Sequence, residues 1–103
     1  MVKELTNLEF FDAIKSRNSV VDFGADWCMP CKLLSPVFES LSKEIKEANF
    51  FKVDVDKEPE LAEKFGVMSV PTIIILKNGK EVSRINGFSG KESLKAQILS
   101  KIK

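Results

Sequence analysis

Residues 19–24 read Ser-Val-Val-Asp-Phe-Gly, and this run constrains the fold more than any other segment of the chain. Apolar residues dominate it, and only Asp22 carries a charge. A strand with one solvated face alternates apolar and polar residues, whereas a nearly continuous apolar run is typical of a strand that is buried on both faces. We therefore expect a sheet that is covered by helices on both sides.

Strand and helix patterns alternate along the rest of the chain. A capping-box pattern that begins at Thr6 opens a first helix, which we expect to run to about residue 17. A long second helix follows the cysteines, and Pro36 inside it is the expected cause of a kink. A short third helix starts at Pro59, and a second capping box at residues 89–92 opens a fourth. The expected strands cover residues 2–5, 19–24, 49–55, 72–76 and 81–86.

The last two strands are joined by Asn78-Gly79, a pair that tolerates the positive φ angles of a tight hairpin, so these strands should be antiparallel. The expected order is β-α-β-α-β-α-β-β-α. It gives an α/β fold with a single central mixed sheet of five strands flanked by four helices. No repeat, linker or low-complexity stretch divides the chain, so we expect one domain over residues 1–103.

The charge balance excludes several classes of partner. Lys and Arg total 16 against 15 acidic residues, a net charge of +1, so the chain has no basic field that would hold nucleic acid or an anionic membrane. Residues 1–10 contain no continuous apolar run. We therefore expect neither a signal peptide nor a membrane anchor, and we place the protein in the cytoplasm.

Cys28 and Cys31 are the only cysteines, and they stand two residues apart shortly after the apolar run. A disulfide between them would stabilise the fold by only roughly 2 kcal/mol, which makes it a weak structural cross-link. A pair held this close suits repeated thiol–disulfide exchange. The chain has no histidine, which excludes Cys-His catalysis and Cys2His2 zinc sites. A metal shared between two chains remains an alternative, but we expect no metal and no cofactor.

Several motifs resemble the thioredoxin family in order and approximate spacing, over essentially the whole chain. They are Val20-Val21-Asp22-Phe23, Trp27-Cys28-Met29-Pro30-Cys31-Lys32, Pro36, Val53-Asp54-Val55-Asp56, Val70-Pro71-Thr72 and Asn86-Gly87. Two positions depart from the pattern: Gly24 replaces a bulky aromatic residue of many relatives, and Met29 replaces the usual glycine between the cysteines. The resemblance implies the thioredoxin fold and a reversible Cys28–Cys31 disulfide.

The two sulfurs are expected to play different parts. Cys28 should lie at the N-terminus of the second helix, where unpaired N–H groups and the helix dipole stabilise a thiolate. It is therefore the expected nucleophile. Cys31, one turn further on, should point inward, be less exposed and resolve the mixed disulfide.

Asp22 is the unusual residue of the apolar strand, because a buried carboxylate costs stability unless it is solvated or paired. In the family the matching aspartate is thought to relay a proton, through water, to or from the inner cysteine. The lysine that matches Lys52 approaches this aspartate in relatives, so that the two titrations are coupled. An ordinary satisfied polar residue is the alternative interpretation of Asp22.

The resemblance also implies a surface that receives an extended segment of the substrate. Pro71 is cis in the family and packs against the sulfurs, and Val70 before it would offer its backbone to the substrate. Pro30 favours entry into the helix, and proline before the second cysteine goes with reducing family members. Each of these residues could instead serve core or loop packing. The substrate-binding candidates are Trp27, Met29, Pro30, Val70, Pro71 and Gly87, with Phe88 as a further candidate.

These features predict a protein-disulfide reductase of the thioredoxin type. Its partners would be oxidised client proteins and a flavoenzyme reductase that supplies electrons, and the chain would act as a monomer. A disulfide oxidase or isomerase is one alternative, although such proteins usually carry histidine between the cysteines and work in an oxidising compartment. A binding clamp or assembly subunit whose redox centre is unused is the other.

Overall fold

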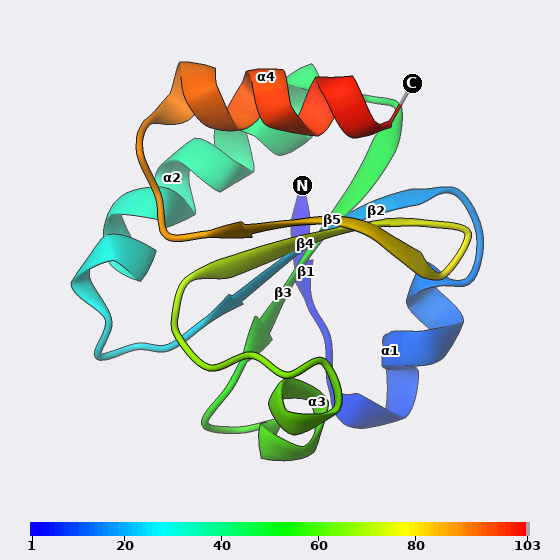
Figure 1. Cartoon of the computed structure of the whole chain (residues 1–103), viewed down its shortest axis with the longest axis vertical. Coiled ribbons are helices and arrows are strands. Elements are labelled where there is room, and N and C mark those ends of the chain that lie inside the picture. The colour runs from blue at the N-terminus through cyan, green and yellow to red at the C-terminus, as the bar shows by residue number, and fades with distance from the viewer. Residues whose placement is uncertain (103) are drawn as a thin grey trace.

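A computed structural model describes residues 1–102; Lys103, the last residue of the predicted domain, lies outside the described residues. One five-stranded sheet runs through the chain in the order β1-β3-β2-β4-β5 (Figure 1). The strands are β1 (Val2–Glu4), β2 (Asn18–Gly24), β3 (Ala48–Asp54), β4 (Thr72–Lys77) and β5 (Lys80–Asn86). The helices are α1 (Asn7–Ile14), α2 (Met29–Glu44), α3 (Pro59–Lys64) and α4 (Lys91–Lys101). The predicted α/β order and the mixed sheet are confirmed.

β2 is the centre of the sheet. It pairs in parallel with β3 along one edge and antiparallel with β4 along the other. The five residues from Ser19 to Phe23 are all buried, as the apolar run predicted. A strand that is hydrogen-bonded on both edges and covered on both faces has no freedom to slip in register.

Two helices cover each face of the sheet, as Figure 1 shows with α2 and α4 on one side and α1 and α3 on the other. Phe38 of α2 and Ile98 of α4 share a buried cluster with Val20 of β2. Phe10 of α1 belongs to the cluster on the opposite face. Because successive strand residues point to opposite faces, Asp22 lies on the same side as Val20, beneath α2. No helix within residues 1–102 has the length and apolar character needed to span a bilayer.

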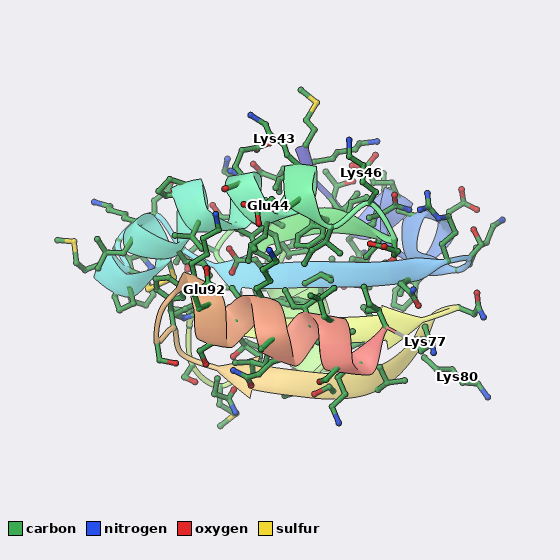
Figure 2. The ribbon with its side chains drawn as sticks, turned by 90° about the horizontal axis from the view of Figure 1, so that it is seen from above. Lys43, Glu44, Lys46, Lys77, Lys80 and Glu92 are labelled. Carbon is green, nitrogen blue, oxygen red and sulfur yellow. A yellow bond between two sulfur atoms is a disulfide. The ribbon has the colours of Figure 1, made fainter. Side chains whose placement is uncertain are left out.

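α2 and α4 also touch through charged side chains. Figure 2 looks onto the face that these helices cover and labels Glu44 at the end of α2. Hydrogen bonds from Lys91 Nζ, and from Lys95 Nζ at 3.0 Å, lower the pKa of the Glu44 carboxyl. Exposed contacts of this kind contribute little to stability, so the buried apolar residues of both helices hold the layer together.

The β4–β5 hairpin turns through Asn78 and Gly79, whose φ angles are 50° and 85°, as the sequence predicted. Asn78 also contacts the segment between α1 and β2. Its N–H donates to the Arg17 carbonyl oxygen at 3.0 Å, and its Oδ1 accepts from the Arg17 N–H at 3.0 Å. Arg17 has a φ of 67°, which is incompatible with a right-handed helix. α1 therefore ends at Ile14 and not near residue 17.

The capping box of α1 is present, because the Thr6 N–H donates to Glu9 Oε1 at 3.1 Å. The second predicted capping box, at residues 89–92, is wrong. α4 begins at Lys91 and its N-cap is Gly90, with a φ of 108°. Glycine adopts that backbone conformation without strain, and it shifts the helix start one residue beyond the position that Ser89 would have capped.

Removal of the Phe10 side chain should be the most informative stability test of the α1–α3 face. Phe10 is fully buried and its ring packs against Phe23 and Phe65. We expect Phe10→Ala to lower the free energy of unfolding by about 3–5 kcal/mol in a urea titration. Phe11→Ala, at a side chain that is 46% exposed, is the matched control and should cost far less. Equal losses for the two variants would contradict the assignment of Phe10 to the core.

Candidate active site

The two cysteines form a disulfide at the start of α2, with their Cα atoms 5.2 Å apart. β2 ends at Gly24, a short loop follows, and Cys28 is the N-cap residue of α2. Its backbone is extended, with φ −89° and ψ 115°, whereas Cys31 already lies in the first helical turn. The rigid centre of the sheet thus positions both sulfurs at one end of the molecule.

The helix terminus favours negative charge on Cys28. The Cys31 N–H donates to Cys28 Sγ at 3.2 Å. Pro30 has no N–H and lies in the same first turn, so the hydrogen bond to the sulfur comes from the next residue. Unpaired N–H groups and the positive end of the helix dipole lower the pKa of a thiol placed there. Cys28 is the sulfur that this geometry stabilises as a thiolate.

The predicted lower exposure of Cys31 is not found. Cys28 is 4% exposed and Cys31 is 8% exposed, so both residues are buried in the disulfide form. Cys28, Cys31 and Ala25 share a small buried cluster, and Cys28 Sγ lies 3.7 Å from the Val70 carbonyl oxygen. Cys31 also borders a pocket next to Gly24, a residue that has no side chain to cover the sulfur.

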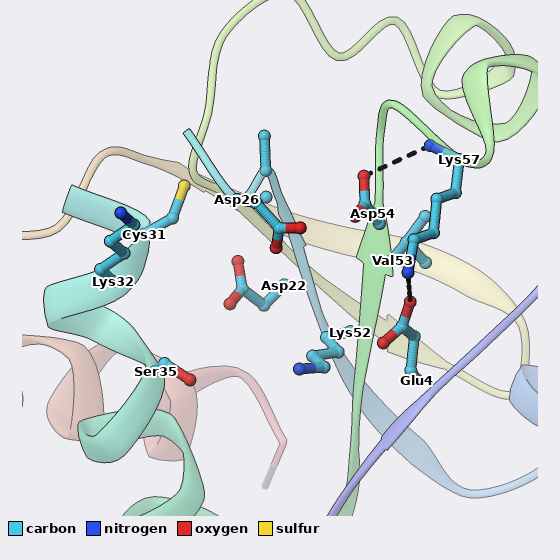
Figure 3. Close-up of a pocket in the computed structure, with 12 residues that line it drawn as sticks. Glu4, Asp22, Asp26, Cys31, Lys32, Ser35, Lys52, Val53, Asp54 and Lys57 are labelled. Carbon is cyan, nitrogen blue, oxygen red and sulfur yellow. Dashed lines mark hydrogen bonds and ion pairs between the residues drawn. The ribbon is translucent and has the colours of Figure 1, made fainter. Parts of the chain in front are cut away.

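This pocket, which we call the Gly24 pocket, measures about 400 Å³ and opens beside β2, β3 and the first turns of α2 (Figure 3). Its lining includes Cys31, the Asp22 carboxylate and several charged side chains from these elements. The residues that line it are Glu4, Asp22, Gly24, Ala25, Asp26, Cys31, Lys32, Ser35, Lys52, Val53, Asp54 and Lys57. The buried carboxylate and one sulfur of the disulfide therefore share a cavity that solvent reaches.

Asp22 is 8% exposed, and its Oδ1 has no hydrogen-bond partner within the described part of the chain. Burial raises the pKa of Asp22 to about 7, and the positive charge of Lys52 opposes this shift. No protein group among the described residues satisfies this oxygen, so the alternative interpretation of Asp22 as an ordinary satisfied polar residue requires a partner such as water. A carboxyl that is half ionised near neutral pH is suited to accepting and releasing protons.

Lys52 lies directly opposite Asp22 in the β2–β3 register, so both side chains point to the α2 face. The lysine is exposed, and no ion pair within 4 Å joins it to Asp22 in residues 1–102. Its charge nevertheless acts on the carboxyl, because it lowers the pKa of Asp22. The approach of these two residues is as the resemblance implied, although it is electrostatic and not a direct contact.

Of the predicted substrate-binding residues, Val70 in the loop before β4 lies next to the disulfide. Val70 is partly buried and its carbonyl oxygen approaches Cys28. The Val70–Pro71 peptide bond is cis, as the resemblance implied, and Pro71 is buried. The Gly87 N–H donates to the Pro71 carbonyl oxygen at 2.8 Å, which joins the loop after β5 to this segment.

Three other predicted residues line the outer side of the disulfide. Trp27 and Met29, on either side of Cys28, are 69% and 64% exposed, and Pro30 is exposed in the first turn of α2. We call Trp27, Met29, Val70 and Gly87 the docking surface. Phe88 does not join it, because its side chain is partly buried against the core on the α2–α4 face.

Sequence reasoning missed two residues beside this surface. The Trp27 indole N–H donates to Asp56 Oδ2 at 2.8 Å, which holds the exposed ring in place. Asp56 stood within a family motif, but nothing in the sequence linked it to Trp27. Met68 is also exposed, in the loop that leads to Val70. An apolar residue in a loop two positions before a substrate-binding candidate was the available signal.

The effect of Asp22 on stability should depend on pH. Its pKa in the folded protein, about 7, lies above the ordinary value of 3.8. Unfolding therefore releases a proton between about pH 4 and pH 7, and the free energy of unfolding falls as the pH rises through that window. We expect Asp22→Asn to be more stable than the parent protein by about 1–4 kcal/mol at pH 8 and by little near pH 4.

Urea titrations at the two pH values measure this difference. Asp26→Asn removes an exposed carboxylate from the same pocket and is the matched control, with no comparable gain expected. An Asp22→Asn protein that is less stable at pH 8 would mean that the carboxylate accepts structural hydrogen bonds, for example from water.

Comparisons with known proteins agree with the fold and the site. The thioredoxin family model matches residues 1–100. A thioredoxin of Chlamydia muridarum is 46% identical over 101 residues, which cover 98% of each chain. A thioredoxin of Staphylococcus saprophyticus is 44% identical over 97% of this chain and 96% of the relative. The solved structure of Plasmodium falciparum thioredoxin has a TM-score of 0.90 and 38% identity, and the match covers 95% of this chain and 97% of that one.

The mixed sheet and the disulfide at the start of α2 define a thiol–disulfide oxidoreductase. The chain belongs to the thioredoxin family, and it is a protein-disulfide reductase that acts on protein substrates and receives electrons from a reductase donor. None of these findings supports the alternatives of an unused redox centre or of a disulfide oxidase or isomerase.

Proposed function

We propose that Cys28 attacks the disulfide of the client protein and that Cys31 resolves the product. The observation that carries this order is the hydrogen bond from the Cys31 N–H to Cys28 Sγ at 3.2 Å, at the N-terminus of α2. A thiolate is the nucleophile in disulfide exchange, so the sulfur with the lower pKa is ready to attack at neutral pH. The slightly greater exposure of Cys31 does not reverse this order, because it faces the Gly24 pocket and not the docking surface.

The exchange then proceeds in two displacements. The Cys28 thiolate bonds to one sulfur of the client disulfide, and the other client sulfur leaves as a thiolate that takes a proton from water. Cys31 loses its proton and attacks Cys28 Sγ, which expels the second client sulfur. The products are a reduced client and the Cys28–Cys31 disulfide, and the reductase donor restores the dithiol with two electrons.

Asp22 accepts the proton of Cys31 in this scheme, through water in the Gly24 pocket. The support is its position in the same pocket as Cys31 and its pKa of about 7, which leaves a large ionised fraction at neutral pH. Lys52 increases the ionised fraction of Asp22, because its positive charge favours the ionised form of the carboxyl.

The docking surface receives an extended client segment. Trp27 and Met29 supply exposed apolar area, and the backbone of Val70 next to Cys28 supplies hydrogen-bonding groups. Pro30 and Pro71 shape this surface from α2 and from the loop before β4. Recognition through backbone groups and a small apolar area reads little sequence, which suits a reductase that serves many clients.

The cellular setting belongs to the same proposal. We place the protein in the cytoplasm, where thiols are kept reduced, with a flavoenzyme reductase as its donor. It acts as a monomer, which leaves the docking surface free for clients. Residues 1–103 form one domain, a view supported by the two buried clusters that share a single sheet.

The order of attack can be tested by trapping. In Cys31→Ser the attack by Cys28 proceeds but the resolving step is absent, so mixed disulfides with client proteins should accumulate. Cys28→Ser is the matched control and should trap few. The measurement is a non-reducing gel after incubation with oxidised client protein. Equal trapping by the two variants would contradict the proposed order, and full reductase activity of both would show that neither sulfur is needed.

The part played by Asp22 can be tested by turnover. Asp22→Asn should slow insulin reduction by about tenfold or more at pH 7–8, because the variant has no carboxylate that can accept the Cys31 proton. The two rates should converge at higher pH, because hydroxide then removes that proton without a base in the protein. A variant with the parent rate throughout this range would exclude Asp22 as the proton acceptor.

A further inference from the structure

The Gly24 pocket reaches the disulfide from a side that the docking surface does not use. Cys31 is among its lining residues and Cys28 is not. No member of the docking surface lines it either. The disulfide therefore has a second approach, which leads to the other sulfur.

Gly24 keeps this approach open. A Cβ atom at this position would lie 3.3 Å from Cys31 Sγ and 3.6 Å from Asp22 Oδ1. A contact of 3.3 Å is already tight. A larger side chain would extend from this Cβ past Cys31 Sγ and occupy the space beside the sulfur. The absence of a side chain at Gly24 therefore leaves one face of Cys31 accessible to a small molecule.

The chemistry of the disulfide favours attack at Cys31. Thiol–disulfide exchange is faster when the leaving sulfur has the lower pKa. Attack at Cys31 expels Cys28, whose negative charge is stabilised by the Cys31 N–H and the N-terminus of α2. A nucleophile that enters through the pocket therefore attacks Cys31, and the sulfur that leaves is Cys28, the better leaving group of the two.

The pocket has the size and charges for a small zwitterion. About 400 Å³ lies within the range of sites that bind small molecules. Among the described residues Lys32 makes no ion pair within 4 Å, so its charge is available to a carboxylate. Asp26 and Asp54 on the same lining offer partners for an ammonium group.

We propose that the Gly24 pocket binds a low-molecular-weight thiol that carries both an amino and a carboxylate group, and that this thiol reduces the disulfide by attack at Cys31. The site goes beyond protein-disulfide reduction, because both the reductant and the attacked sulfur differ from those of the client reaction. It provides a source of electrons that does not need a protein donor.

The reaction balances with two molecules of the thiol. The first, as a thiolate, bonds to Cys31 Sγ, the Cys28–Cys31 bond breaks and Cys28 leaves as a thiolate. The second attacks the small-molecule sulfur of the mixed disulfide and expels Cys31 as a thiolate, which takes a proton from Asp22 or from water. Two thiols are oxidised to one small disulfide, and the protein disulfide is reduced to the dithiol.

Mapping of the mixed disulfide tests which sulfur is attacked, with L-cysteine as the probe. The oxidised, unsubstituted protein is mixed with L-cysteine, quenched within seconds by excess N-ethylmaleimide and digested for mass spectrometry. We expect the cysteine adduct on Cys31 and the maleimide on Cys28. An adduct found mainly on Cys28 would overturn the proposal without affecting the order of attack on client proteins.

A variant tests the route. Gly24→Phe fills the pocket and should slow reduction by L-cysteine about tenfold or more, because access to the attacked sulfur limits exchange. Its rate with a thiol fixed on the surface of a folded protein, which is too large to enter the pocket, should change less than twofold. Equal slowing of both reactions, or of neither, would overturn the proposed route. Val82→Phe adds the same side chain at an exposed position on β5 and is the matched control.

The charge requirement has its own test. Lys32→Gln should slow reduction by L-cysteine several-fold and leave reduction by 2-mercaptoethanol, which has no carboxylate, unchanged. Equal effects on the two thiols would overturn the assignment of a zwitterionic ligand.

Discussion

β2 is hydrogen-bonded along both edges and packed against helices on both faces, so it cannot move without disturbing both buried clusters. The active site is held rigidly for the same reason. One end of β2 leads through a short loop to the N-cap of α2, and the alternation of its side chains puts Asp22 on the α2 face beneath the disulfide. The positions of the two sulfurs and the carboxylate therefore follow from the placement of a single strand.

The same burial that stabilises β2 makes Asp22 costly. Burial raises the pKa of Asp22 because water no longer solvates the charge. The folded protein is therefore less stable at neutral pH than it would be without this carboxylate. The Gly24 pocket limits that cost by letting solvent reach the site from one side. An aromatic side chain at position 24 would close this access. The glycine thus links the proton chemistry of Asp22 to the accessibility of Cys31.

The parts of the fold that depend on local sequence could be predicted. The apolar run at residues 19–24 indicated a strand buried on both faces, and Asn78-Gly79 indicated the hairpin, because each pattern acts within a few residues. The end of α1 could not be predicted, since Arg17 takes its positive φ where it bonds with Asn78, 61 residues away. The contact of Cys31 with the Gly24 pocket could not be predicted either. It depends on a side chain that Gly24 lacks, and on how β2 packs beneath α2.

The two outer strands have a consequence for behaviour at high concentration. Unpaired backbone groups on an edge strand are a template for other chains and a common origin of aggregation. β1 has 3 residues and offers a very short template. β5 is longer, but charged Lys80, Glu81 and Arg84 occur along it, and its register with β4 is irregular between Ile75 and Leu76. Both features discourage addition of a further strand. The sheet is thereby protected from growing into a larger assembly while one end of the molecule stays open to oxidised clients.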